Sequence, residues 1–256
     1  MTEGRLAGTV ALVTGASSGI GEATAAALAA EGAALAIAAR RRDRLDDLAA
    51  RIGANGEGRV LVLETDVTDE EQARAAVERT AAELGRLDTL VNNAGVMLLG
   101  PIVGAPVEEW RRMVELNLLG LLYCTHAALP HLLEAAAAKP RQVADIVNVS
   151  SVAGRVARLG SGVYNATKFG VGAFSESLRQ EGVPIGVRVT LIEPGAVATE
   201  LAGHNRPEVL QTIRSNFEGV ERMSAEDIAE SIVFTVTRPR HVVINEVLIR
   251  PTEQER

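Results

Sequence analysis

The sequence predicts an α/β protein: a single-domain Rossmann fold, with a doubly wound, seven-stranded parallel sheet and helices on both faces. Three observations predict it. Short apolar runs alternate with helical patterns along the 256 residues, which is typical of right-handed β-α-β crossovers. The first run leads directly into a glycine-rich turn and a helix. No linker or shift in composition divides the chain, so we expect one domain over residues 1–256.

Composition narrows the function classes. Apolar residues make up 47% of the chain, which fits an ordered globular protein, and a net charge of −7 leaves no basic footprint for nucleic acid or an anionic membrane. The single cysteine, Cys124, rules out an internal disulfide and agrees with a reducing compartment. The first ten residues lack the apolar segment of a secretory signal, and polar residues interrupt the apolar run at 116–138. We therefore expect a cytoplasmic protein with no nucleic-acid or membrane partner.

The first predicted strand, residues 10–14, ends in the segment TGASSGIG. Its glycines let the backbone turn tightly and approach a ligand, and the first N–H groups of the next helix form a pocket for phosphate. The spacing differs from the dinucleotide fingerprint G-x-G-x-x-G. Glu22 stands where a P-loop would carry lysine, which disfavours nucleoside triphosphate hydrolysis. The alternative to a phosphate site is a plain strand-to-helix turn.

The second predicted strand, residues 34–39, is followed by Arg40, Arg41 and Arg42. In dinucleotide folds an acidic residue near this position binds the ribose 2′-hydroxyl, whereas arginine accommodates a 2′-phosphate. The arginines therefore favour NADP(H) over NAD(H). The alternative is a solvated, basic start of a helix.

The remaining elements follow the same alternation. Strands are predicted at residues 60–65, 87–91, 146–149, 187–192 and 243–249. Thr68 with Glu71 predicts a capping box, and Ser224 with Asp227 caps a last helix that runs to about Thr235. A long helix is expected over 108–138. Residues from about 195 to 223 show no strong period, and we expect a mobile lid over the substrate there.

Tyr164 and Lys168 stand four residues apart in a predicted helix, in a chain with two tyrosines and two lysines. That spacing places them on one helix face, where an ammonium group can act on a phenol. A free tyrosine has a pKa near ~10, so acid-base chemistry at neutral pH needs a neighbour that favours the phenolate. The alternative is a surface tyrosine beside a solvated lysine. Asn117 lies in an apolar helical pattern, where its amide needs a structural or catalytic partner.

Together these motifs resemble the classical short-chain dehydrogenase/reductase family. The resemblance rests on TGASSGIG, NNAG, Asn117, Ser151, the Tyr164-x-x-x-Lys168 pair and Pro194-Gly195, and it spans essentially the whole chain. The glycine spacing is the one that this family uses. The segments MLLGP, TKFG, SLRQE and IRPTEQ are similar to a bacterial branch that includes clavulanic acid dehydrogenase.

The resemblance implies which residues form the site. The implied catalytic residues are Asn117, Ser151, Tyr164 and Lys168. Those implied to bind the cofactor are Gly15, Ser17, Ser18, Gly19, Ile20, Gly21, Arg40, Arg41, Asp66, Val67, Asn93, Ala94, Gly95, Tyr164, Lys168, Pro194, Gly195, Val197 and Thr199. The residues expected to face the substrate are Val96, Met97, Val152 to Arg155, Leu159, Ala196 and the lid, with a cationic rim at Arg155.

The function implied is an NADPH-dependent carbonyl reductase in which Tyr164 donates a proton to a small-molecule aldehyde or ketone. An NADP-dependent alcohol dehydrogenase that works oxidatively is the alternative within the same chemistry. A dinucleotide-sensing protein without catalysis would be free to lose the four catalytic residues, and all four are present. The resemblance also implies a homo-oligomer, a tetramer or a dimer. The four histidines lack metal-ligand spacing, so no metal site is predicted.

Overall fold

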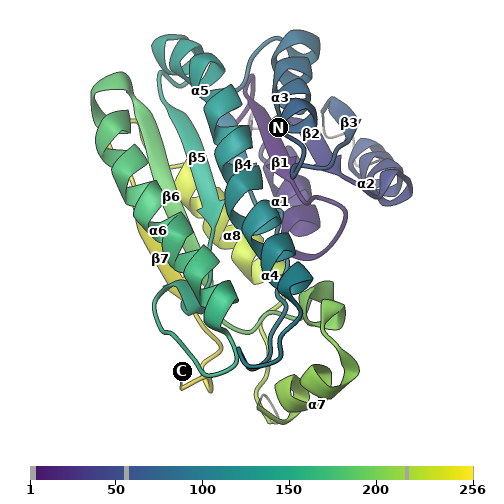
Figure 1. Cartoon of the computed structure of the whole chain (residues 1–256). Coiled ribbons are helices and arrows are strands. Elements are labelled where there is room, and N and C mark those ends of the chain that lie inside the picture. The colour runs from purple at the N-terminus through teal and green to yellow at the C-terminus, as the bar shows by residue number, and fades with distance from the viewer. Residues whose placement is uncertain (1–3, 55–57, 217–218, 256) are drawn as a thin grey trace.

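Seven parallel strands form one sheet in the computed structural model, which describes residues 4–54, 58–216 and 219–255. Within these residues the strand order is β3-β2-β1-β4-β5-β6-β7 (Figure 1). The strands are β1 Val10–Thr14, β2 Ala34–Ala39, β3 Val60–Glu64, β4 Thr89–Asn92, β5 Ala144–Val149, β6 Val187–Pro194 and β7 Glu246–Ile249. The predicted seven-stranded parallel sheet is confirmed.

The strand order reverses between β1 and β4, which are neighbours in the sheet although β2 and β3 lie between them in sequence. In open α/β sheets such a reversal leaves a crevice beyond the carboxyl ends of the strands, where ligands bind. The glycine-rich turn after β1 and the NNAG segment after β4 both stand at this point. The fold therefore brings two of the predicted motifs together.

Helices cover both faces of the sheet (Figure 1). On one face α1 Gly19–Ala30, α2 Arg42–Ala54 and α8 Ala225–Val236 share an apolar core with the strands. The other face carries α3 Glu70–Leu84, α4 Val107–Val114, α5 Gly120–Ala137 and α6 Gly162–Gly182. Strands β1 and β2 read as continuous apolar runs because helices bury both of their faces.

Three local predictions differ from the structure. Helix α3 begins after Asp69, whose carboxylate accepts a hydrogen bond from the N–H of Gln72, whereas Thr68 bonds to Asp66, so the predicted Thr68–Glu71 capping box is wrong. The expected helix over 108–138 is interrupted by a π-helical turn, Glu115–Leu119. The last strand begins at Glu246 and not at residue 243 as predicted. The segment from about 195 to 223, whose sequence shows no strong period, contains a 3₁₀ helix, Glu200–His204, and helix α7, Pro207–Asn216. The Ser224–Asp227 capping box is confirmed.

The stretch from α4 to α5, Val107–Ala137, is long and apolar enough to cross a membrane by length and composition alone. Within it Cys124, Ala128 and Leu132 are buried in the core cluster that includes residues of α3 and the sheet. Burial in the core accounts for the apolar pattern of α5.

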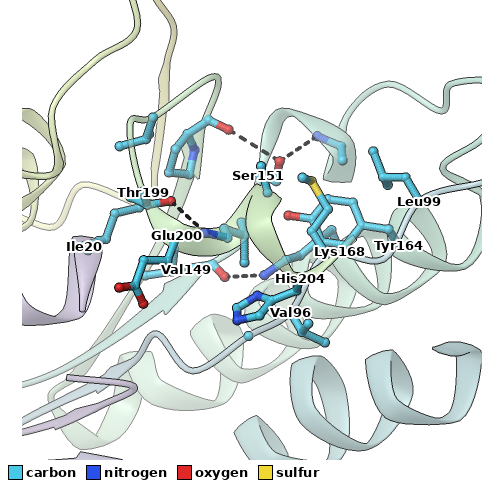
Figure 2. Close-up of a pocket in the computed structure, with 18 of the residues that line it drawn as sticks. Ile20, Val96, Leu99, Val149, Ser151, Tyr164, Lys168, Thr199, Glu200 and His204 are labelled. Atoms are coloured by element: carbon cyan, nitrogen blue, oxygen red, sulfur yellow. Dashed lines mark hydrogen bonds between the residues drawn. The ribbon is translucent and has the colours of Figure 1, made fainter. Parts of the chain in front are cut away.

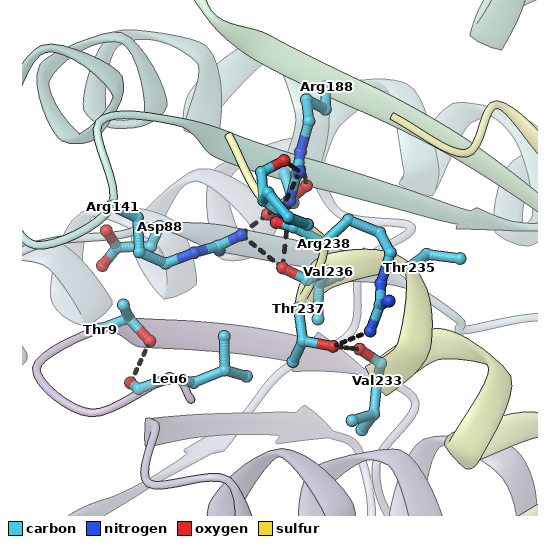
Figure 3. Close-up of polar contacts among 12 residues, drawn as sticks. Leu6, Thr9, Asp88, Arg141, Arg188, Val233, Thr235, Val236, Thr237 and Arg238 are labelled. Atoms are coloured by element: carbon cyan, nitrogen blue, oxygen red, sulfur yellow. Dashed lines mark hydrogen bonds and ion pairs between the residues drawn. The ribbon is translucent and has the colours of Figure 1, made fainter. Parts of the chain in front are cut away.

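A buried charged cluster holds the amino ends of β5 and β6, at the edge of the sheet away from the crevice (Figure 3). The guanidinium of Arg188 donates to both carboxylate oxygens of Asp145, at 2.7 and 3.0 Å, and Arg141 donates to the same carboxylate at 2.8 Å. Arg188 also donates to the carbonyl oxygen of Val236 at the end of α8. Every charged group in this cluster has a partner. The hydrogen bond from Arg188 to Val236 ties the sheet to α8.

Candidate active site

A cleft of about 1250 Å³ opens at the carboxyl edge of the sheet. All the predicted catalytic and cofactor-binding residues line it except two, Gly21 and Asn117. Of the residues expected to face the substrate, Gly154 and Arg155 do not line it. Loops after β1, β2, β4, β5 and β6 form its walls, together with the lid segment and the C-terminal tail.

The glycine-rich turn presents main-chain N–H groups to one end of the cleft. Gly15 and Gly19 have φ values of +66° and +56°, which other residues rarely adopt. Ser18 is the N-cap residue of α1, but its side chain makes no capping hydrogen bond. The first-turn N–H groups of α1 therefore remain available to an anion, as a phosphate site requires.

Asn93 fixes this turn from the neighbouring strand. Its amide nitrogen donates to the carbonyl oxygens of Thr14 at 2.9 Å and Gly15 at 3.2 Å. Gly21 lies behind the turn, where an added Cβ would stand 2.4 Å from both the Gly15 oxygen and the Asn93 amide nitrogen. Gly21 thus allows α1 to approach the turn closely and does not line the cleft.

Of the three consecutive arginines, Arg41 is the one that contacts the glycine-rich turn. Its guanidinium donates to the Ser17 hydroxyl at 3.1 and 3.2 Å and to the Ser18 hydroxyl at 2.8 Å. Arg40 is more exposed and stands 3.9 Å from the Asp66 carboxylate. Arg41, Ser17 and Ser18 therefore form a hydrogen-bonding group that suits a phosphate.

Ser151 and Tyr164 place two hydroxyls on the opposite part of the wall (Figure 2). The Ser151 oxygen accepts from the N–H of Ala153 at 3.1 Å and donates to the Pro194 carbonyl at 3.4 Å, which holds it between the loops after β5 and β6. Burial raises the pKa of Tyr164 to about 12, and a hydrogen bond with Ser151 opposes this only in part. The phenol is therefore protonated at neutral pH.

Lys168 lies one helical turn beyond Tyr164 on α6, with its ammonium nitrogen 5.9 Å from the centre of the phenol ring. Burial lowers the pKa of Lys168 to about 8, and the ammonium donates to the carbonyl oxygen of Val149 at 2.9 Å. The predicted effect of Lys168, to favour the phenolate, is not among the causes that set the pKa of Tyr164. Burial decides that pKa in this structure.

Asn117 lies behind the cleft, inside the π-helical turn. Its side-chain oxygen accepts from the N–H of Val96 at 2.7 Å, and its amide nitrogen donates to the Val96 carbonyl at 2.9 Å and the Thr167 hydroxyl at 3.2 Å. An added Cβ on Gly95 would stand 3.3 Å from the Asn117 oxygen and 3.8 Å from the Lys168 nitrogen. Asn117 and Lys168 thus both come close to the position that a Cβ of Gly95 would occupy.

The segment predicted as a lid, from about 195 to 223, forms part of the cleft wall, where Figure 2 labels its Thr199, Glu200 and His204. Asn205 accepts from the N–H of Leu99 at 2.7 Å and donates to the Met97 carbonyl at 2.9 Å. Arg206 forms an ion pair of 3.0 Å with Glu109 of α4. On the other side, Glu200 contacts Arg41 and Arg44.

The expected substrate end of the cleft carries many apolar side chains, beside polar ones such as His204, Glu208 and Thr212. Its lining includes Val96, Met97, Leu99, Val152, Leu159, Leu201, Val209 and Ile213. The prediction of a cationic rim at Arg155 is wrong, because its guanidinium is paired with the buried Glu193 at 2.8 Å and with Glu246, and the residue does not line the cleft. Arg158 and Arg222 line the cleft instead.

Three contributors to the site were missing from the sequence-based prediction: Glu200, Asn205 and Gln254. The Gln254 side chain accepts from the N–H of Ala196 at 2.8 Å, so the C-terminal tail supports the loop after β6. Gln254 ends the segment IRPTEQ, but no local pattern shows the contacts of these three residues, because each has a partner far away in the chain. Among the described residues, no group of three or more histidine, cysteine, aspartate or glutamate side chains could hold a metal ion.

Comparisons with known proteins agree on the type of protein. A family model described as short chain dehydrogenase matches residues 9–210. An uncharacterized oxidoreductase of Staphylococcus saprophyticus is 37% identical over 248 residues, which cover 96% of each chain. Glycine betaine reductase ATRR of Emericella nidulans is 40% identical over 252 residues, which cover 98% of this chain but 19% of the fungal protein.

Solved structures extend the comparison to the fold. The closed form of serine dehydrogenase complexed with NADP+ has a TM-score of 0.87 at 32% identity, with 97% of each chain covered. The alcohol dehydrogenase of Thermococcus sibiricus complexed with 5-hydroxy-NADP has a TM-score of 0.85 at 28% identity, covering 97% of this chain and 98% of that one. The 3-ketoacyl-(acyl-carrier-protein) reductase of Brucella melitensis complexed with NADH has a TM-score of 0.83 at 30% identity, covering 96% and 98%.

Proposed function

Because the chain belongs to the short-chain dehydrogenase/reductase family, we propose that it is an NADPH-dependent carbonyl reductase, which converts an aldehyde or ketone to an alcohol. One observation carries the proposal: the Tyr164 phenol lies beside the Ser151 hydroxyl in the wall of a cleft whose other end suits a dinucleotide (Figure 2). The similarity to the branch that includes clavulanic acid dehydrogenase stays a prediction.

The residues of the cleft fit NADP(H). The N–H groups at the start of α1 would hold the pyrophosphate, and Arg41 with Ser17 and Ser18 would hold the 2′-phosphate. Similar structures complexed with NADP+ and with 5-hydroxy-NADP support this assignment. Asp66, Val67, Pro194, Val197 and Thr199 also line the cleft, in agreement with the cofactor contacts that the family implies.

When bound, NADPH supplies a hydride to the carbonyl carbon of the substrate. The Ser151 hydroxyl would donate a hydrogen bond to the carbonyl oxygen, which becomes negative as the new C–H bond forms. Tyr164 would give that oxygen its proton and complete the alcohol. Lys168, held by Val149, would stabilise the resulting phenolate. A proton from solvent would then return to Tyr164 along a path beside Gly95, to which both Lys168 and Asn117 lie close.

A protonated Tyr164 fits the proton donor that the reductive direction needs. A phenol with a pKa of about 12 keeps its proton at neutral pH, and a reduction needs a proton donor at this position. Oxidation of an alcohol needs the phenolate, which is scarce in this environment. The NADP-dependent alcohol dehydrogenase remains the second candidate, and the alcohol and serine dehydrogenases among the similar structures support it. A sensor without catalysis is disfavoured because the complete catalytic set is in place.

The apolar wall of the substrate end supports a substrate with a hydrocarbon part next to its carbonyl group. The known relatives carry names for different substrates, among them alcohol, serine and a 3-ketoacyl group, so they support the reaction type rather than one compound. Glycine betaine reductase is a much longer protein, of which this chain matches 19%.

Three further features belong to the proposal. The chain would act as one domain, in which the segment from about 195 to 223 opens and closes over the substrate. It would work in the cytoplasm on a small molecule. It would assemble as a homotetramer or a dimer, partly through the helices that carry Asn117 and Tyr164.

Spectrophotometry of NADPH oxidation would test the proposed function directly. The purified protein is mixed with NADPH and a panel of aldehydes, ketones, quinones and β-ketoacyl thioesters. We expect turnover with at least one carbonyl class and a higher kcat/KM with NADPH than with NADH. Turnover only with alcohols and NADP+ would favour the oxidative alternative.

A further inference from the structure

Glu200 brings a carboxylate to the cationic end of the cleft. One of its oxygens accepts from Arg41 at 2.8 Å, and the other accepts from Arg44 at 2.7 Å. Glu200 is the first residue of the 3₁₀ helix in the lid segment, whereas both arginines come from the region just after β2. The ion pairs therefore cross from the lid to the far side of the cleft.

The carboxylate is permanently charged under ordinary conditions. Hydrogen bonds from Arg41 and Arg44 lower the pKa of Glu200 to about 2. Its side chain is 45% exposed, so another anion can compete with it for the arginines. The same Arg41 guanidinium contacts Ser17 and Ser18, the hydroxyls that would share a phosphate with it.

A 2′-phosphate competes with the Glu200 carboxylate for the arginines, whereas a 2′-hydroxyl does not. The phosphate carries negative charge and several acceptor oxygens, so it requires the guanidinium donors that Glu200 uses. The hydroxyl of NADH has no charge and gains little from them. Competition by Glu200 therefore weakens the binding of NADPH and leaves the binding of NADH unchanged.

We propose that Glu200 is a specificity-determining residue, which occupies Arg41 and Arg44 in the free protein and must be displaced by the 2′-phosphate. The inference rests on the proposed use of NADP(H). It makes the chain less selective for NADPH than its arginines alone would make it. It also means that binding of the 2′-phosphate removes the contacts of Glu200, at the start of the 3₁₀ helix, with Arg41 and Arg44.

Calorimetric titration of the free protein measures how Glu200 affects ligands with and without a 2′-phosphate. The ligands are NADPH and NADH, together with 2′,5′-ADP and ADP, which lack the nicotinamide and so cannot report on catalysis. We expect Glu200→Gln to tighten binding of NADPH and 2′,5′-ADP roughly 3- to 10-fold, the size expected for losing two exposed ion pairs. The Kd values of NADH and ADP should stay within about 2-fold of the original.

A matched variant controls for the change in net charge. Glu83 pairs with Arg79 at 2.8 Å on α3, away from the cleft, and Glu83→Gln should leave all four Kd values unchanged. Combining Glu200→Gln with Arg41→Ala should abolish most of the gain for 2′,5′-ADP, because the donor being competed for is gone.

Two other results would overturn the inference in different ways. If Arg41→Ala weakens 2′,5′-ADP but Glu200→Gln leaves it unchanged or weakens it, then Glu200 does not compete, while the proposed use of NADPH survives. If the protein binds 2′,5′-ADP no better than ADP and Arg41→Ala changes neither, then the proposed use of NADPH is wrong and the role of Glu200 falls with it.

Discussion

The ammonium nitrogen of Lys168 donates a hydrogen bond of 2.9 Å to the carbonyl oxygen of Val149, the last residue of β5. This bond fixes a charged side chain of α6 to the carboxyl end of the sheet. It also leaves the ammonium 5.9 Å from the centre of the Tyr164 ring. The sheet therefore holds the ammonium group of Lys168 close to the phenol.

We expect kcat/KM for carbonyl reduction to fall as the pH rises through about 8. Burial lowers the pKa of Lys168 to about 8, so the side chain loses its charge above this value. Tyr164, with a pKa of about 12, keeps its proton over the same range, so the fall reports on the lysine. A pH profile of kcat/KM reads this ionisation in the free enzyme. Lys168→Arg, which stays charged, should lack the fall if active; a wild-type profile that stays level to about pH 10 contradicts the assignment.

Arg41→Ala should weaken NADPH binding by about 10- to 100-fold, because hydrogen bonds from a charged donor are lost. Binding of NADH should change by less than about 2-fold. Fluorescence titration with each cofactor measures both constants. Arg42→Ala is the control, since Arg42 pairs with Asp46 on α2 and does not line the cleft. Equal losses for the two cofactors would point to damage of the scaffold.

Exchanging Arg40 as well should weaken NADPH binding little further, because the Arg40 side chain is exposed.

Asn117→Ala should lower the free energy of unfolding by about 2–4 kcal/mol. The substitution leaves the buried N–H and carbonyl groups of Val96 without their partner. Urea denaturation followed by circular dichroism gives the value. The exposed Gln180 serves as the control, and its alanine variant should stay within about 0.5 kcal/mol of the original. A loss below about 1 kcal/mol for Asn117→Ala would show that the Val96 loop is held by other contacts.

Asn205→Ala should loosen the lid and weaken both cofactors by the same factor. Asn205 joins the lid to the main chain of Met97 and Leu99 and does not contact the arginines at the other end of the cleft. Hydrogen exchange over residues 199–206 should become faster in the variant. Gln211→Ala, an exposed change on α7, should leave the exchange unaltered. Unchanged exchange in Asn205→Ala would mean that the lid is held elsewhere.

Much of the fold was predictable because it depends on local patterns. The bounds of β1 and β2 agree with the sequence-based prediction, since helices on both faces make these strands uniformly apolar. The pairing of Tyr164 with Lys168 follows from the helical pitch alone. The π-helical turn around Asn117 was not predictable, because it depends on how the side chain pairs with the Val96 backbone.

Long-range ion pairs were the main gap. Glu200 forms ion pairs with Arg41 and Arg44, which precede it by 159 and 156 residues. Arg155 pairs with Glu193, which follows it by 38 residues. With 33 acidic and 26 basic side chains in the chain, no local pattern shows which of them meet. The sequence therefore predicted Arg41 as a phosphate ligand but could not show the carboxylate that pairs with it.

Replacement of Tyr164 by phenylalanine tests the central claim most directly, because it removes one oxygen and keeps the ring in its buried site. NADPH affinity is measured by fluorescence and single-turnover reduction by absorbance. The account predicts a rate at least about 100-fold lower, with the Kd for NADPH within about 2-fold of the original. Turnover close to that of the unaltered protein would contradict the role of Tyr164 as proton donor.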